Sequence, residues 1–233
     1  MQMKEHKQLL SCGGIKMNIK QLELIIFDLD GTLVDSEQVY RRGWVEVLKS
    51  YGHKVDESVF EVMRGQSTKH NNQIIKNYLG SDQLVQEARD LREAYYYDAL
   101  EKDTVALKDG AREMILAAYH NGLKIGVATS SYKKRGLATL KRFDLAKYFD
   151  YMVFGDEVNH AKPHPEIYKK VLEQAGVSVN KSMAVEDSSS GLQSALAAGL
   201  TVCFVPEGET SLDGIEGKFK TYTSLNEVQR ELF

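Results

Sequence analysis

Two pairs of acidic residues follow short apolar runs in this sequence. Asp28 comes directly after the run 24–27, with Asp30 two residues further on, and Glu186 with Asp187 follows the run 183–185. Either pair alone would be read as turn or capping residues. If both runs are strands of one parallel sheet, however, the four carboxylates meet at one crevice and repel one another unless a cation neutralises them. Hard oxygen ligands of this kind suit Mg²⁺.

Hydroxyl and amino groups follow other apolar stretches of the chain. Thr129 and Ser130 come after the run 125–128, where hydroxyls and backbone N–H groups at a helix start form an anion site. Lys162 precedes Pro163, which keeps the chain extended before the next helix. Alone, Thr129 would be a helix cap and Lys162 a solvated surface charge. Together with the acidic pairs they predict a phosphate-binding site. In such a site, the positive charge of Lys162 holds both the phosphoryl group that is transferred and the nucleophile that attacks it.

The elements that must position these residues are visible as alternating patterns. Apolar runs predict buried strands at 24–27, 125–128, 151–154, 183–185 and 202–205. Helical patterns lie between them at 111–120, 133–142, 166–174 and 191–198, and several end at a glycine. This alternation predicts an α/β fold, a Rossmann-like parallel sheet with helices on both faces.

One region breaks the alternation. Residues 36–103 show helical periodicity without a convincing strand, with helices expected at 37–50, 68–78 and 83–101. An insert after the first strand lies above the carboxyl ends of the strands and acts as a lid. We therefore expect a catalytic core of 17–35 and 104–233 and a helical cap of 36–103. Residues 1–16 are expected to be a disordered tail or an upstream start, with Met17 as the functional beginning.

Composition excludes several classes of partner. The chain is 42% hydrophobic and 27% charged with a net charge of -3, which argues against nucleic acid. No apolar run approaches the about 20 residues of a membrane span, so we expect no membrane partner. Cys12 and Cys203 show neither metal-site spacing nor a disulfide framework, which favours a cytoplasmic location. No obligate protein partner is inferred.

In this order, the four motifs resemble those of the haloacid dehalogenase superfamily. The resemblance is to the phosphatase and phosphomutase branch, which carries a helical cap after the first strand, and it covers residues 22–205. Asp28-Leu29-Asp30-Gly31-Thr32 looks like the first motif of that family. Thr129 looks like its second motif, Lys162 like its third, and Glu186-Asp187 like its fourth.

The resemblance implies a two-step displacement. Asp28 attacks phosphorus and forms an aspartyl-phosphate, while Asp30 gives a proton to the leaving alkoxide and later takes one from water. Mg²⁺ is held by Asp28, the backbone carbonyl of Asp30, and Asp187 with help from Glu186. The groups expected to bind the substrate phosphate are Thr129, Ser130 and Lys162.

A sugar phosphomutase of the β-phosphoglucomutase type remains the main alternative to a phosphatase. Such mutases carry a histidine where this chain has Tyr40, and a Lys-Gly-x-Ser-Arg stretch that grips a second phosphate. Here the stretch reads Arg64-Gly65-Gln66-Ser67-Thr68, with threonine in the place of the arginine. Both differences favour the phosphatase.

Two further alternatives are weaker. A dehalogenase needs neither a proton donor such as Asp30 nor a metal. A non-catalytic binding protein on the same scaffold would be free to lose Asp28, Asp30 or Lys162, and none is lost.

The expected substrate is a small phosphorylated metabolite of the sugar or polyol phosphate class, because a helical cap closes over a modest pocket. The candidate specificity residues all lie in the predicted cap: Glu37, Tyr40, Arg64 and Gln66.

Overall fold

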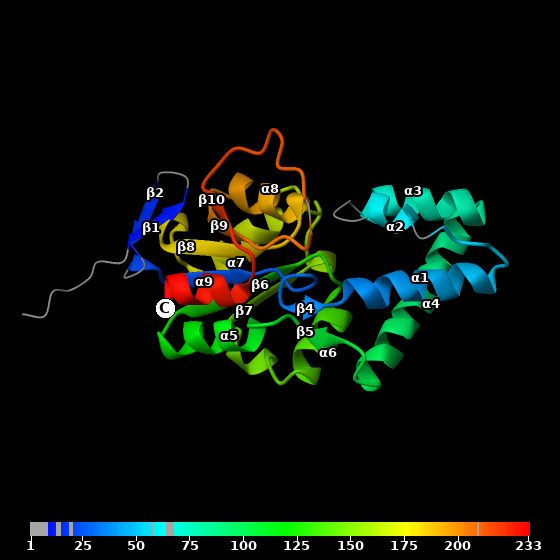
Figure 1. The fold of residues 1–233 in the computed structure, drawn as a ribbon, viewed down its shortest axis with the longest axis horizontal. Helices are drawn as coiled ribbons and strands as arrows, with labels where there is room; N and C mark the ends of the chain where they lie inside the picture. The colour runs from blue at the N-terminus through cyan, green and yellow to red at the C-terminus, as the bar shows by residue number, and fades with distance from the viewer. Residues whose placement is uncertain (1–8, 13–14, 19–20, 57, 64–67, 209) are drawn as a thin grey trace, which may run out of the picture.

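A six-stranded parallel sheet forms the centre of the protein (Figure 1). The computed structural model describes residues 9–12, 15–18, 21–56, 58–63, 68–208 and 210–233. Every neighbouring pair of strands in this sheet is parallel, in the order β10-β9-β8-β3-β6-β7. The strands are β3 (Leu24–Phe27), β6 (Lys124–Thr129), β7 (Tyr151–Phe154), β8 (Ser182–Glu186), β9 (Thr201–Phe204) and β10 (Phe219–Thr221). The predicted α/β fold class is confirmed.

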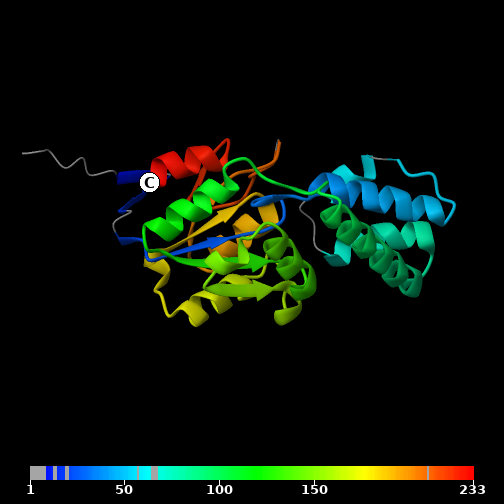
Figure 2. The ribbon, with the colours of Figure 1, turned by 90° about the horizontal axis from the view of Figure 1, so that it is seen from below.

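Alternating side chains of the strands enter two separate hydrophobic clusters. Ile25 and Phe27 of β3 belong to one cluster, and Leu24 and Ile26 belong to the other. This is the period-two pattern of a strand buried on both faces, and each fully buried aliphatic or aromatic side chain contributes about 1.5–3 kcal/mol. Helices α5 (Ala111–His120) and α9 (Leu225–Leu232) cover the first face, and α7 (Glu166–Ala175) and α8 (Ser189–Ala197) cover the second (Figure 2).

Four helices extend from one end of this core, and we call them the cap. They are α1 (Glu37–Ser50), α2 (Ser58–Met63), α3 (Thr68–Leu79) and α4 (Asp82–Glu101). Trp44, Leu48, Phe60 and Ile75 form a hydrophobic cluster within the cap. In contrast, the last turns of α4 join the first cluster of the core through Tyr96, Ala99 and Leu100. We retain the division into core and cap as a proposal, which these clusters support.

Two short antiparallel pairs complete the fold. β4 (Val34–Asp35) pairs with β5 (Ala106–Leu107) where the chain leaves the core for the cap and where it returns. β1 (Leu9–Cys12) pairs with β2 (Ile15–Asn18), across the predicted boundary between tail and core. These four strands, together with α2, α9 and β10, were not predicted from the sequence. Among the described residues, no helix combines the length and the apolar character of a membrane span.

Candidate active site

The register of the sheet brings the predicted acidic pairs together. Phe27 lies opposite Val185 of β8 and opposite Val127 of β6. The next residue, Asp28, donates its backbone N–H to the carbonyl of Val185 at 3.0 Å, so it lies beside Glu186 at the carboxyl ends of the strands. The parallel register therefore explains why residues far apart in the sequence share one site.

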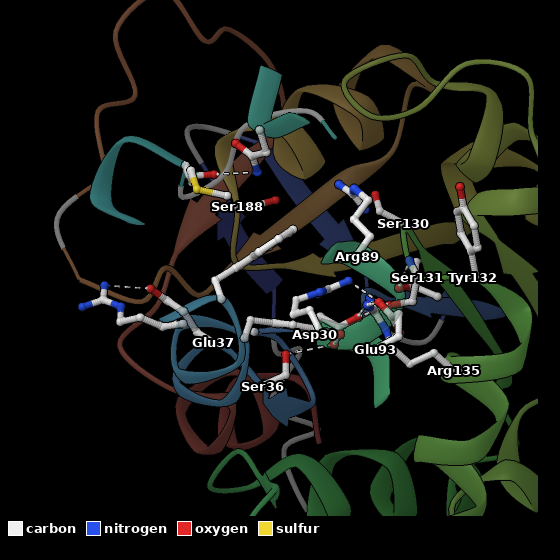
Figure 3. Close-up of a pocket in the computed structure, with 18 of the residues that line it drawn as sticks. Asp30, Ser36, Glu37, Arg89, Glu93, Ser130, Ser131, Tyr132, Arg135 and Ser188 are labelled. Atoms are coloured by element: carbon white, nitrogen blue, oxygen red, sulfur yellow. Dashed lines mark hydrogen bonds and ion pairs between the residues drawn. The ribbon is translucent and has the colours of Figure 1, made fainter. Parts of the chain in front are cut away.

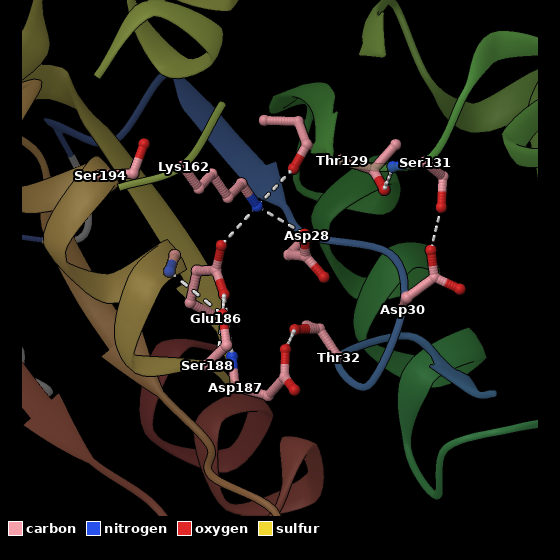
Figure 4. A network of polar contacts seen from close by, with 12 residues as sticks. Asp28, Asp30, Thr32, Thr129, Ser131, Lys162, Glu186, Asp187, Ser188 and Ser194 are labelled. Carbon is pink, nitrogen blue, oxygen red and sulfur yellow. Dashed lines mark hydrogen bonds and ion pairs between the residues drawn. The ribbon is translucent and has the colours of Figure 1, made fainter. Parts of the chain in front are cut away.

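Lys162 lies at the centre of this site and is almost fully buried. Its Nζ donates to Asp28 Oδ1 at 2.5 Å, to Glu186 Oε1 at 2.6 Å and to the carbonyl of Ala128 at 2.9 Å (Figure 4). Burial alone would lower the pKa of Lys162, but the carboxylates of Asp28 and Glu186 raise it above its usual value. Lys162 is therefore a fixed positive charge that orients Asp28.

Glu186 is completely buried and has protein donors on both carboxylate oxygens. Oε1 accepts from Lys162 and, at 2.6 Å, from the hydroxyl of Tyr168. Oε2 accepts from the backbone N–H of Asp187 at 3.2 Å and from the hydroxyl of Ser188 at 3.3 Å. Glu186 thus orients the neighbouring groups through several bonds, and its role at the metal stays a prediction.

Asp187 packs against the turn that follows Asp28. Its Oδ1 accepts from the hydroxyl of Thr32 at 2.8 Å. Gly31 has φ +89°, and a Cβ there would come within 2.2 Å of Asp187 Oδ2. Glycine therefore serves two needs in the first motif, because it adopts the left-handed conformation and leaves room for the carboxylate.

The donor set fits a hard divalent cation. One carboxylate oxygen each of Asp28, Glu186 and Asp187 lie within 4.8 Å of one another. Burial, followed by repulsion from Glu186 and Asp187, raises the pKa of Asp28 well above its usual value in spite of Lys162. Burial and the Glu186 charge likewise raise the pKa of Asp187 to about 7. Negative charge thus exceeds what Lys162 neutralises, and oxygen ligands of this kind suit Mg²⁺.

Asp30 belongs to a different network on the cap side of the site (Figure 4). Its Oδ1 accepts from Ser36 at 2.9 Å and from the Tyr40 hydroxyl at 3.4 Å, and its Oδ2 accepts from Ser131 and, at 3.3 Å, from Arg135. Burial alone would raise the pKa of Asp30, but Arg135 and the bonds from Ser131 and Ser36 hold it below its usual value. The side chain of Asp30 is therefore separate from the cluster of Asp28 and Asp187, and only its backbone remains a candidate for the metal.

The three consecutive hydroxyl residues that begin at the last residue of β6 take different positions. Thr129 is fully buried, and its Oγ1 accepts the backbone N–H of Ser131 at 3.0 Å. Ser130 is exposed and lines the cavity described below, and its role as a phosphate ligand stays a prediction. Ser131 was not predicted as a site residue, although its place in a hydroxyl-rich run after a strand was a usable signal.

A cavity of about 780 Å³ lies between the strand ends and the cap (Figure 3). Its floor includes Asp28, Lys162 and Asp187, and its cap side includes the predicted Glu37 and Tyr40. Glu37 also forms an ion pair with Arg41 at 3.5 Å. Arg64 and Gln66, the other two candidate specificity residues, lie outside the described residues.

Sequence reasoning missed three arginines that line this cavity. Arg135, from α6 (Lys133–Arg142), enters it from the core, and Arg89 and Arg92 enter it from α4 of the cap. Arg135 donates to Glu93 of α4 at 3.0 Å, and Arg92 pairs with the same carboxylate. In the sequence each of these residues reads as an ordinary exposed helix charge, and no spacing signal connects them.

A second cluster of metal-binding residue types lies on the surface. His160 and His164 have ring centroids 4.5 Å apart, and His160 Nδ1 lies 2.7 Å from Glu166 Oε2. Both imidazoles are largely exposed, and Glu166 also accepts the backbone N–H groups of Asn159 and His160. These bonds tie the loop to the start of α7, a structural role that accounts for the cluster.

The fold and the four motif positions together define a haloacid dehalogenase-like hydrolase. The family model of that description matches residues 25–205, and the chain belongs to this family. A phosphorylated carbohydrates phosphatase of Thermotoga maritima is 34% identical over 181 residues, which cover 77% of this chain and 82% of that protein. A fructose-1-phosphate phosphatase of Escherichia coli is 30% identical over 180 residues, covering 76% and 92%. Among solved structures, a family IA hydrolase of Entamoeba histolytica is 28% identical, with a TM-score of 0.79 and coverage of 91% and 97%.

Proposed function

We propose that this hydrolase is a magnesium-dependent phosphatase of small phosphorylated metabolites of the sugar or polyol class. The chain is a phosphoric monoester hydrolase of the haloacid dehalogenase-like family, whose named relatives above act on phosphorylated carbohydrates. The observation that carries the proposal is the meeting of Asp28, Lys162 and Asp187 on the floor of the cavity, with Asp30 at its cap side.

Asp28 is the proposed nucleophile. Lys162 holds Oδ1 at 2.5 Å, which fixes the orientation of the carboxylate. A carboxylate oxygen attacks phosphorus, the bond from phosphorus to the ester oxygen breaks, and an aspartyl-phosphate forms. Water then attacks this phosphorus and releases inorganic phosphate, which restores the Asp28 carboxylate.

Asp30 is the proposed proton-transfer group. It gives a proton to the leaving alkoxide in the first step and takes a proton from the attacking water in the second. The lowered pKa of Asp30 favours its ionised form in the substrate-free protein, which is the form that the second step needs. The first step needs the protonated form, so the proton must arrive with, or after, the substrate.

The remaining residues bind charge. Thr129, Ser130 and Lys162 are proposed to position the phosphoryl group. Held by Asp28, Asp187 and the backbone carbonyl of Asp30, with Glu186 in support, Mg²⁺ would neutralise charge on the phosphoryl oxygens.

Tyr40 supports a phosphatase over a phosphomutase. It occupies the position at which β-phosphoglucomutase-like enzymes carry a histidine, and burial raises its pKa well above its usual value. A tyrosine in this state does not exchange protons near neutral pH, in contrast to an imidazole. Thr68, the second difference from the mutases, lies at the start of α3.

The test is magnesium-dependent release of inorganic phosphate from a panel of sugar and polyol phosphates that includes fructose 1-phosphate. We expect turnover of at least one panel member, and we expect its loss when EDTA removes the metal. Isomerisation of a sugar phosphate, primed by a bisphosphate and without phosphate release, would instead show a mutase. Binding of panel members without any turnover would show a non-catalytic protein.

A further inference from the structure

Arg135 is a side chain of the core that reaches into the cap. It lies on α6 of the core, and only 14% of its side chain is exposed. Its guanidinium lies 4.7 Å from the ring centroid of Tyr40 on α1 and 5.6 Å from that of Tyr96 on α4. The two rings stack on each other with centroids 5.2 Å apart. Arg135 therefore packs against the place where the first and last cap helices meet.

The hydrogen bonds of Arg135 join the two parts of the protein (Figure 3). Nη1 donates to Glu93 of the cap at 3.0 Å. Nη2 donates to Asp30 Oδ2 at 3.3 Å and also to the hydroxyl of Ser131, which in turn donates to the same oxygen of Asp30. One planar group thus links a cap carboxylate to the carboxylate proposed to transfer protons.

We propose that Arg135 is a positioning residue that aligns Asp30 only when α4 of the cap is docked on the core. This inference rests on the proposed function, because it gives that reaction a residue which connects cap closure to proton transfer. If α4 moves away from the core, Glu93 leaves and the guanidinium loses one of the two carboxylates that hold it. Asp30 then loses a fixed donor on Oδ2.

Arginine suits this task better than lysine. Its fork of N–H groups serves two carboxylates at fixed angles while its flat face stacks on the aromatic rings, whereas an ammonium is a point charge on a flexible stem. Arg92 is the natural comparison, because it also pairs with Glu93 and lies 4.6 Å from the Tyr40 centroid. Its other aromatic neighbour is Trp44 of α1, so these contacts stay within the cap.

The test uses two leaving groups. An alkoxide from a sugar phosphate needs a proton from Asp30 as it leaves, whereas para-nitrophenolate leaves as a stable anion. The ratio kcat/KM reports the reaction only up to the first irreversible step, so the later use of Asp30 as a base does not enter. We therefore compare kcat/KM for para-nitrophenyl phosphate with kcat/KM for fructose 1-phosphate, or for the panel member that the wild type hydrolyses fastest.

Arg135→Met is expected to lower kcat/KM for the sugar phosphate at least about tenfold more than for the aryl phosphate. For Arg135→Lys, the difference between the two substrates is expected to lie between that of Arg135→Met and that of the wild type. The matched control is Lys141→Met, which removes a positive charge from an exposed position of the same helix. Lys141 does not line the cavity, so both substrates should change by the same factor.

Failure of the positioning role and failure of the proposed phosphatase activity give different results. Equal losses on both substrates in Arg135→Met, or an unequal loss of the same direction in Lys141→Met, would overturn the positioning role while the phosphatase stands. A wild type that hydrolyses neither substrate would overturn the proposed function and the inference with it. If Arg135→Met does not fold, Glu93→Gln is measured instead. A larger loss of kcat/KM for the sugar phosphate than for the aryl phosphate supports the positioning role, and equal losses overturn it.

Discussion

The charges at the strand ends are unbalanced without a metal. Lys162 bridges Asp28 and Glu186, while Asp187 is bonded to the neutral hydroxyl of Thr32. Burial, followed by repulsion among the carboxylates, raises the pKa values of Asp28 and Asp187. At neutral pH this cluster of carboxylates therefore disfavours the folded state, and a divalent cation bound there, as proposed, would reverse this effect.

This imbalance predicts how the stability of the metal-free protein depends on pH. The pKa of Asp187 is about 7 in the folded protein, above the value of about 3.9 for an unperturbed aspartate. Between these values the folded state binds more protons than the unfolded state, so the contribution of Asp187 to the free energy of unfolding falls as pH rises. In EDTA, raising the pH from about 5.5 to about 8 should lower the Tm of the wild type more than the Tm of the Asp187→Asn protein. Equal losses in both proteins would contradict the assignment.

Replacing the proposed nucleophile separates chemistry from stability. Asp28→Asn should lower kcat by at least about a thousandfold, because an amide does not attack phosphorus. In EDTA its Tm should equal or exceed that of the wild type, since one of the repelling carboxylates is gone. Asp109→Asn, an exposed aspartate in a turn, is the matched control and should change neither quantity. Turnover by Asp28→Asn close to that of the wild type would rule out the mechanism.

At the scale of single elements, the start of α8 is shaped around Glu186. Ser188 caps the helix by accepting the backbone N–H of Gly191 at 3.1 Å. A Cβ on Gly191 would come within 2.0 Å of Glu186 Oε1 and 2.1 Å of Oε2. The glycine therefore allows the helix to pass directly over the buried carboxylate that orients Lys162.

This close approach reverses the usual effect of a helical glycine-to-alanine change. In an open helix, alanine is more stable than glycine by about 1 kcal/mol. Gly191→Ala should instead destabilise the protein by about 1–3 kcal/mol, because Glu186 has to move within a packed interior. Urea unfolding measures the change, and Gln193→Ala on the exposed side of the same helix should stay near zero. A more stable Gly191→Ala protein would show that Glu186 is free to move aside.

The elements also show what the sequence could and could not reveal. Strands such as 24–27 and 183–185 were predictable because they are continuous apolar runs, and the motif residues were predictable because they follow those runs. β10 was not, because its residues are partly buried or exposed and form no apolar run. Arg135 and Glu93 lie on helices from different parts of the chain, and their meeting depends on how α4 docks on α6. Local periodicity contains no information about such docking.

At the scale of the whole molecule, the cap is stabilised in two different ways. Its distant part has its own cluster around Trp44, Phe60 and Ile75, while the end of α4 shares the core cluster through Tyr96 and Leu100. Local opening of the distant part therefore leaves the central sheet intact.

Ile75→Ala tests this arrangement. The side chain is completely buried in the cap cluster, so its truncation should cost about 2–5 kcal/mol of local stability. Hydrogen exchange should become faster in α2 and α3 while exchange in β3, β6 and β8 stays unchanged. Leu91→Ala, a leucine of α4 with 48% exposure, is the control and should alter neither region. An equal increase in the sheet would mean that cap and core unfold as one unit.

The pairing of β4 with β5 has a consequence for how such enzymes diversify. Val34 lies opposite Leu107 and Asp35 opposite Ala106, so the cap departs and returns at neighbouring points, about 5 Å apart in a paired ladder. An insert whose ends lie this close can be exchanged for another without altering the register of the six-stranded sheet. The paired strands thus let the distant part of the cap vary while β3 and β8 keep Asp28 and Asp187 in place, and α4, which is joined to Asp30 through Glu93 and Arg135, is the part that has to be kept.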